Sequence, residues 1–203
     1  MNYFVTAIGT DSGKTVVSSI LCEALGADYW KPVQAGLPRD TETVMQLVTN
    51  NRTKFHPEQY LLKTPASPHA AARIDGVNIE LASFVLPSTR NTLIIEGAGG
   101  CLVPLNDRDF VIDVIQPFQS EVILVSNLYL GSINHTLLTA EALKRRNVKV
   151  RGLIFNGDSN EESERIILSH TGFHCLLRIK HEPVMNAQVV KSYAATLKQN
   201  WDG

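Results

Sequence analysis

A short glycine-rich segment near the N-terminus constrains the fold more than any other part of the sequence. Residues 9–15 (GTDSGKT) follow the apolar run 3–8 and precede residues 15–25, where apolar side chains recur at helical spacing. A strand that turns through glycines into a helix directs backbone N–H groups, and the positive end of the helix dipole, at a bound anion. The sequence therefore predicts a phosphate-binding loop between the first strand and the first helix.

This loop departs from the G-x-x-x-x-G-K-[ST] pattern at one position, because Ile8 stands where the pattern has its first glycine. The tripeptide Gly13-Lys14-Thr15 is retained. In such loops the lysine reaches the β- and γ-phosphates of a nucleotide, and the hydroxyl of the last residue binds Mg²⁺. The preceding strand and the following helix favour this interpretation over an ordinary turn.

Elsewhere, short β-branched runs alternate with amphipathic stretches. This order is typical of a parallel sheet with helices on both faces, so we predict an α/β, doubly wound, mainly parallel fold of the P-loop NTPase type. The length of 203 residues suits one domain, 1–203.

The polar, proline-containing stretch 51–72 is predicted to be a loop. Gly131 and Ser132 are expected to form a turn and N-cap. The other predicted strands are 29–33, 93–96, 122–126, 150–156 and 174–179, and the other predicted helices are 41–48, 133–143 and 187–197.

Composition narrows the range of partners. Lysine and arginine total 19 against 20 for aspartate and glutamate, so the formal net charge of −1 offers no general attraction to nucleic acid or to an anionic membrane. The cysteines Cys22, Cys101 and Cys175 are odd in number and form no C-x-x-C pair, which fits a reducing compartment. The N-terminus does not resemble a signal peptide, and no apolar run approaches the ~20 residues of a spanning helix. We therefore expect a cytoplasmic protein.

Two acidic residues could complete a metal site at the predicted loop. Magnesium usually takes one or two carboxylates in addition to substrate phosphates. Glu96 ends the apolar run 93–96 and is followed by residues 97–100 (GAGG); it is either a metal ligand or a strand-end acid satisfied by solvent. Asp40 either binds the metal or caps the helix that follows it. Thr15, Asp40 and Glu96 are the candidate ligands.

Lys31 is a candidate for a second cation at the phosphate site. It follows Tyr29 and Trp30 and precedes Pro32, so an extended chain would carry its ammonium group to the C-terminal edge of the sheet. A cation there, beside Lys14, would stabilise the negative charge that develops in phosphoryl transfer. A purely structural role for Lys31 is the alternative.

Five motifs, in their order along the chain, carry a resemblance to a known family. They are Gly13-Lys14-Thr15 and the segments 31–36 (KPVQAG), 67–69 (SPH), 96–100 (EGAGG) and 130–135 (LGSINH). Together they resemble dethiobiotin synthetases. The resemblance implies an ATP- and Mg²⁺-dependent ligase of biotin synthesis. Such an enzyme joins CO₂ to 7,8-diaminononanoate (7,8-diaminopelargonic acid) through a carbamate and a carbamic-phosphoric anhydride, and releases ADP and phosphate.

The resemblance also implies roles for single residues. Lys31 and Lys14 would be catalytic, and Thr15, Asp40 and Glu96 would hold Mg²⁺. Ala35 stands at a substrate-binding position where many members carry serine or threonine, so Gln34 or a backbone group would replace that hydroxyl. ATP would contact Asp11, Ser12, Gly13, Lys14, Thr15, Val16, Glu96, Gly97, Ala98, Gly99, Asn156 and Gly157. Residues 179–183 would help to contact the adenine. Gly131, Ser132, Ile133 and Asn134 would bind the substrate carboxylate from the other subunit of a homodimer.

Other functions stay open at this point. Partitioning or membrane-associated P-loop ATPases work as nucleotide-switched dimers, but they usually carry a second lysine early in the loop, where this chain has Thr10. A nucleotide-binding module without enzymatic activity would also need the loop. Amidotransferase-like synthetases share the loop but require a glutaminase domain, for which 203 residues leave no room.

Overall fold

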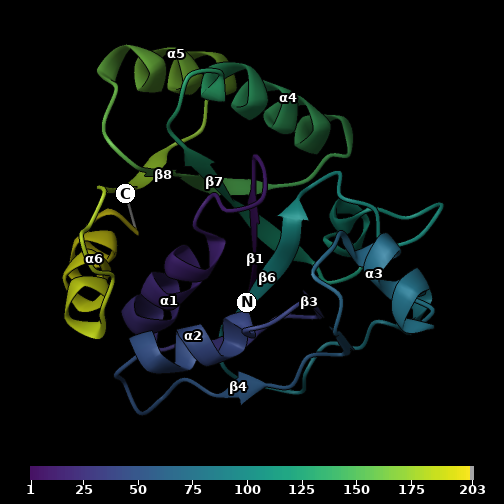
Figure 1. Ribbon diagram of the computed structural model, residues 1–203. Helices are drawn as coiled ribbons and strands as arrows, with labels where there is room; N and C mark the ends of the chain where they lie inside the picture. Colours follow the sequence, from purple (N-terminus) through teal and green to yellow (C-terminus); the bar gives the residue numbers. More distant parts are fainter. Residues whose placement is uncertain (202–203) are drawn as a thin grey trace.

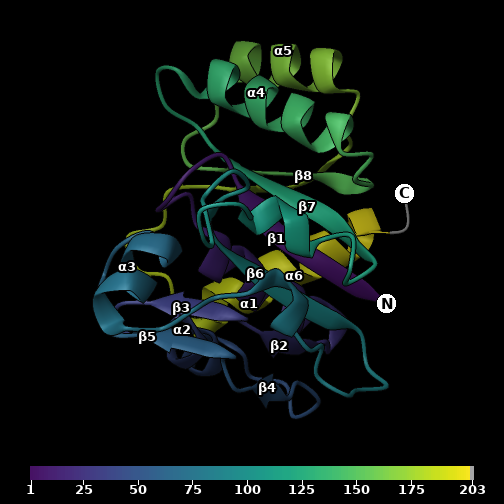
Figure 2. The same ribbon diagram turned by 90° about the vertical axis from the view of Figure 1, so that its right-hand side faces the viewer.

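Parallel strand pairing dominates the fold. Among residues 1–201, which the computed structural model describes, the strands form a seven-stranded sheet and a separate two-stranded sheet, and every ladder is parallel (Figures 1 and 2). The strands are β1 (Asn2–Ala7), β2 (Asp28–Trp30), β3 (Val33–Ala35), β4 (Phe55–His56), β5 (Tyr60–Leu62), β6 (Leu93–Gly100), β7 (Ser120–Asn127), β8 (Val150–Asn156) and β9 (Cys175–Ile179). The large sheet has the order β4-β2-β6-β1-β7-β8-β9, and β3 pairs with β5.

Helices cover both faces of the large sheet, as parallel neighbours require crossover connections. The helices are α1 (Lys14–Leu25), α2 (Asp40–Leu47), α3 (Pro68–Asp75), α4 (Ser132–Arg145), α5 (Glu161–Thr171) and α6 (Ala187–Trp201), with 3₁₀ helices η1 (Leu81–Ser83) and η2 (Val111–Val114). Figure 1 shows α4 and α5 on one face, and α1, α2 and α6 on the other. The predicted α/β, doubly wound fold is confirmed.

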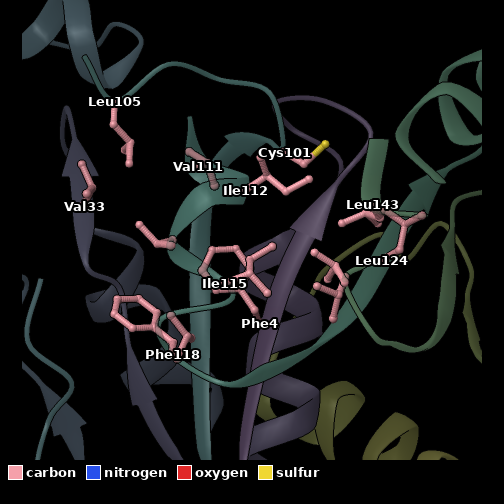
Figure 3. Packing of buried hydrophobic residues seen from close by; sticks show 14 of the residues in the cluster. Phe4, Val33, Cys101, Leu105, Val111, Ile112, Ile115, Phe118, Leu124 and Leu143 are labelled. Carbon is pink, nitrogen blue, oxygen red and sulfur yellow. The ribbon is translucent and has the colours of Figure 1, made fainter. Parts of the chain in front are cut away.

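The central strand β1 is buried on both faces. Phe4 points into the cluster that contains Ile115 and Phe118, where Figure 3 shows these side chains gathered. Val5, its neighbour, points into the opposite cluster with Ile20 of α1. Because its side chains point alternately to the two faces of the sheet, β1 contributes to both hydrophobic cores. Because β1 lies between β6 and β7, the loop that follows it lies in the middle of the sheet's C-terminal edge, where doubly wound sheets bind ligands.

The prediction of a single strand at 29–33 is wrong. Asp28–Trp30 belongs to the large sheet as β2, whereas Val33–Ala35 forms β3 in the small sheet. Pro32 separates them because it has no N–H to donate to a ladder. Its carbonyl oxygen instead accepts hydrogen bonds from the backbone N–H groups of Gln59 and Tyr60.

The prediction of a loop over 51–72 is also wrong, because the segment contains β4, β5 and the start of α3. Strands of two and three residues are too short to show alternation in sequence. Helix α3 begins at Pro68, and a proline is well suited to the first helical position, where an N–H group has no helical partner.

Helix α5 was not predicted, although its start carries a recognisable signal. The side chain of Asn160 accepts a hydrogen bond from the N–H of Ser163, and three glutamates occupy the first turn. At α4 the N-cap is Gly131, so Ser132 is the first helical residue and not the predicted cap. The other predicted strands and helices are present. The predicted strand 150–156 coincides with β8, whereas the rest are shifted at one or both ends; β6, for example, continues past Glu96 to Gly100. Within residues 1–201, no helix combines the length and apolar character that crossing a membrane requires.

The packing of α5 is tested by a matched pair of isoleucines in helices. Ile167 in α5 is fully buried, whereas Ile74 in α3 is 68% exposed. Replacing Ile167 with alanine is expected to lower the free energy of unfolding by about 2–5 kcal/mol through lost burial and a cavity. Ile74→Ala should stay within about 0.5 kcal/mol of the parent. Urea denaturation measures both, and equal losses would contradict the placement of α5.

Candidate active site

The turn after β1 has the backbone geometry of an anion-binding loop. Gly13 has a φ of 94° and Asp11 a φ of 56°, both in the left-handed region. A Cβ at Gly13 would clash with the side-chain amide of Asn156 at the end of β8, and the left-handed φ would strain any other residue at this position. Ser12 Oγ and Lys14 Nζ both donate to the carbonyl oxygen of Gly9, at 3.1 and 3.3 Å. These bonds close the turn at the N-terminus of α1, where helical N–H groups lack partners within the helix.

An open pocket of about 720 Å³ lies against this loop. Its other walls come from the segments after β2 and β3, the C-terminal part of β6, and residues 65–68 at the start of α3. Many of the predicted site residues line it together, namely Asp11, Gly13, Lys14, Thr15, Lys31, Ala35, Asp40, Glu96, Ala98 and Gly99. The wall formed by 65–68 was not predicted as part of a binding site.

Lys31 is the centre of a charged network in the pocket. Its Nζ lies 2.5 Å from Oδ2 of Asp40 and 3.0 Å from Oε1 of Glu96, and it also donates to the carbonyl oxygen of Gly97 at 3.1 Å. Thr15 Oγ1 donates to the same Glu96 Oε1 at 3.0 Å. One lysine therefore joins the end of β2, the start of α2 and strand β6 around the phosphate loop.

The two lysines differ in their electrostatic surroundings. Burial works against a charged Lys31, but Glu96 and then Asp40 outweigh it, so the pKa of Lys31 is raised and its ammonium form is favoured. Nearby carboxylates compensate less for the burial of the charged Lys14. Burial, and next the neighbouring Lys31 ammonium, lower the pKa of Lys14 to about 8. The pocket thus holds one firmly charged lysine and one whose charge depends on what binds beside it.

The geometry argues against the non-metal alternative for each of the two carboxylates. Glu96 is 1% exposed and bonded to protein groups, so it is not a strand-end acid satisfied by solvent. Asp40 is the first residue of α2 and Arg39 is the N-cap, so the alternative in which Asp40 caps the helix does not hold, although its carboxylate lies in the first turn. Its carboxylate pairs with Lys31, and its N–H donates to Oε1 of Gln34.

Other predicted residues support the loop or lie apart from the pocket. Asn156 Nδ2 donates to the carbonyl oxygen of Ser12 at 3.0 Å, and the N–H of Gly157 donates to Ile179 at 2.8 Å, so the end of β8 joins the loop to the end of β9. Val16 is half-buried one residue further along α1. In the described part of the chain, the turn at residues 131–134 is not among the walls of the pocket.

The donor set fits a magnesium ion bound with a nucleotide. The Thr15 hydroxyl contacts the Glu96 carboxylate, and the carboxylates of Glu96 and Asp40 both contact Lys31 Nζ, so the three oxygen donors are linked along one side of the pocket. All are hard oxygen donors, and Mg²⁺ usually takes only one or two carboxylates because phosphates and water complete its octahedron. These three residues could therefore hold Mg²⁺ beside the loop.

Comparison with known proteins decides the family. A family model described as an AAA domain matches residues 1–189. The ATP-dependent dethiobiotin synthetase BioD of Cytophaga hutchinsonii is 62% identical, over 98% of each chain, and that of Christiangramia forsetii is 47% identical, over 98% of this chain and 96% of the other. The chain belongs to the dethiobiotin synthetase family. Membership confirms the predicted family and the predicted class, an ATP-dependent ligase.

More distant solved structures share the fold of this dethiobiotin synthetase family member. The septum site-determining protein MinD of Pyrococcus horikoshii, solved as a complex with Mg-ADP, aligns with a TM-score of 0.61 at 15% identity, over 98% of this chain and 90% of that one. The cell division ATPase MinD of Pyrococcus furiosus aligns at 0.60 and 12% identity, over 99% and 98%. At such low identity the likeness extends to the fold alone.

The lowered pKa of Lys14 makes a prediction about nucleotide binding. Near pH 8 the lysine is about half protonated in the free protein, and a bound phosphate favours its charged form. ATP binding should therefore take up protons at pH 8, and the affinity should fall as the pH rises above 8. Calorimetry in buffers of different ionisation enthalpy measures the uptake.

A Lys14→Met variant is the control for this titration, since it keeps a long side chain without the amine. Its remaining ATP binding should show less proton uptake than that of the parent at pH 8. Equal uptake in the two proteins would assign the protons to another group and contradict the prediction.

Proposed function

We propose that this protein forms dethiobiotin from 7,8-diaminononanoate and CO₂, with ATP and Mg²⁺ as co-substrate and cofactor, in the cytoplasm, and that 1–203 acts as one P-loop domain. One observation carries the proposal beyond family membership. Two lysines, two carboxylates and a threonine hydroxyl converge on a single pocket of about 720 Å³ beside the loop. This size leaves room for a second small substrate next to the phosphates.

The positive charges would serve the first chemical step. Alkyl amines have pKa values near about 10.4, so both amines of the substrate are mostly protonated at neutral pH and cannot attack CO₂. The ammonium groups of Lys31 and Lys14 disfavour a further ammonium group in the pocket and favour a carbamate anion. An amine that enters would thus release its ammonium proton to solvent and attack CO₂. Loss of a second proton from the nitrogen to solvent then gives the carbamate anion.

The same charges would stabilise phosphoryl transfer. A carbamate oxygen attacks the γ-phosphorus of ATP and ADP leaves, which gives a carbamic-phosphoric anhydride. Lys14 and Lys31 would lie beside the charge that develops on the transferred group, and positioning with charge neutralisation supplies most of the catalysis in such reactions. Bound Mg²⁺ would add neutralisation of the phosphate oxygens. The second amine then attacks the anhydride carbonyl, expels phosphate and closes the cyclic urea.

Ala35 lacks the hydroxyl that many family members have at this substrate-binding position. The substrate contact there is best assigned to a backbone group. Gln34 was an alternative partner, but its Nε2 donates to the carbonyl oxygen of Gly36 at 3.1 Å and its Oε1 accepts from the N–H of Asp40 at 3.0 Å. Both ends of this buried amide are therefore engaged within the protein. We assign the contact at Ala35 to a backbone group of that segment.

We further propose that the active form is a homodimer, built on an apolar face beside α4. Leu102 and Leu138 are 50% and 61% exposed and border a hollow that reaches Gly9 and Thr10 of the phosphate loop, and Leu130 is fully exposed in the adjoining turn. A second copy on this face would cover the apolar side chains. It would also place its own 131–134 turn, with the N-terminus of α4, near the substrate end of the pocket.

Phosphate release tests the proposed reaction. With ATP and Mg²⁺ present, inorganic phosphate should be released only when the diamine and bicarbonate are both added, since the anhydride cannot form without the carbamate. Release that is independent of the diamine would instead indicate a simple ATPase.

Replacing Lys31 with alanine in this assay should reduce the rate at least about a hundredfold, on the scale of a lost charge-stabilising group. Lys63→Ala, which removes a lysine exposed on the surface, is the matched control. ATP binding by Lys31→Ala must be retained for the comparison to count, and a near-parental rate would remove Lys31 from the catalytic role.

The homodimer is tested by a pair of leucines exposed to similar extents. Leu138→Asp places a charge on the proposed interface and should convert the dimer to monomer in sedimentation velocity. Leu61→Asp, at a leucine 50% exposed on β5, should leave the dimer intact, because the small sheet lies at the other end of the molecule from α4 (Figure 2). A monomeric parent protein, or a dimeric Leu138→Asp variant, would refute this interface.

A further inference from the structure

Tyr29 is a buried tyrosine that lies outside every motif of the family resemblance. It is the middle residue of β2 and pairs in register with Ile94 on β6, two residues before Glu96. Residues two apart on a strand point to the same face of the sheet, so Tyr29 and Glu96 share the face covered by α1. The ring is fully buried and lies with its centroid 6.3 Å from that of Phe55. Packing therefore fixes where its hydroxyl points.

The Tyr29 hydroxyl donates a hydrogen bond to Oε2 of Glu96 at 3.0 Å, and both groups are buried. The other carboxylate oxygen, Oε1, accepts from Thr15 Oγ1 and from Lys31 Nζ. The two oxygens of Glu96 therefore have separate environments. Oε1 faces the phosphate loop and the lysine, and Oε2 faces the tyrosine behind the pocket.

This division matters because a buried carboxylate oxygen without a donor is unfavourable. Without the tyrosine hydroxyl, Oε2 would lose the hydrogen-bond partner that the structure gives it. The carboxylate would then gain by rotating so that both oxygens share Thr15 and Lys31. Rotation of the Glu96 carboxylate would change which of its oxygens faces the pocket. It would also change the direction in which the lone pairs of that oxygen point.

We propose that Tyr29 is a positioning residue, whose hydroxyl fixes the orientation of the Glu96 carboxylate so that Oε1 alone is presented to the metal of the proposed Mg–ATP complex. The inference rests on the proposed function, since it assumes that Glu96 binds the metal. Groups that hydrogen-bond to metal ligands orient them, and their loss typically weakens metal binding by about 10–100-fold.

The substitution Tyr29→Phe tests this proposal, because it removes the hydroxyl and keeps the packed ring. We expect the Mg²⁺ concentration that half-saturates metal-dependent ATP binding to rise about tenfold, with ATP binding in the absence of metal changed less than twofold. Calorimetric titration of ATP at a series of Mg²⁺ concentrations measures both. The control is Tyr3→Phe, on β1 at the other side of β6. This substitution removes the hydroxyl of a buried tyrosine that donates to Met1 Sδ and not to Glu96.

Glu96→Gln, measured in the same way, separates this inference from the function beneath it. If Glu96→Gln leaves the Mg²⁺ dependence unchanged, the metal role of Glu96 in the proposed function fails. If Glu96→Gln raises the requirement while Tyr29→Phe matches Tyr3→Phe, the positioning role is overturned and the proposed function stands. The binding stoichiometry at saturating Mg²⁺ guards against misfolding, because an unfolded fraction lowers the number of sites without shifting the half-saturation point.

Discussion

Lys31 lies between the carboxylates of Asp40 and Glu96 in the wall of the open pocket, and the architecture of the candidate active site depends on this interaction. The side chains of Lys31 and Glu96 are 5% and 0% exposed, so removal of the Lys31 ammonium group would leave the Glu96 carboxylate buried without its ion-pair partner. The ammonium group also holds the carbonyl oxygen of Gly97. The network therefore fixes the relative positions of β2, α2 and β6 at the edge where the phosphate loop opens.

The charged groups that hold the candidate site together are also the groups that the proposed reaction would use. A cluster of two carboxylates and one firmly charged lysine lies beside Lys14, whose charge is weakly compensated. In the proposed reaction, such a pocket would attract phosphate through Lys14 and would offer oxygen donors to a metal through Thr15, Asp40 and Glu96. Because these groups are held by strands and helices more than by loops, they need little reorganisation when a substrate binds.

The candidate site residues were easier to predict from the sequence than the ends of the strands and helices. Gly13, Lys14 and Thr15 were recognisable because a glycine-rich turn between a strand and a helix has a local signature. Lys31 and Glu96 were candidates because each follows an apolar run, and strands of a parallel sheet end at a shared edge. Three features had weak signals or none in sequence: the split at Pro32, the short strands β4 and β5, and the wall at residues 65–68. Each depends on pairing or packing with residues far along the chain.

The phosphate loop, the parallel sheet and the family could all be recognised without coordinates, since they follow from local periodicity, from glycine positions and from motifs in a recognisable order. The folded structure sets which polar groups meet. It placed Asp40 against Lys31 and not in a cap, engaged both ends of the Gln34 amide, and brought the Tyr29 hydroxyl to the hidden oxygen of Glu96. Such contacts join residues up to 67 positions apart. They depend on strand order and register, which local sequence patterns do not specify.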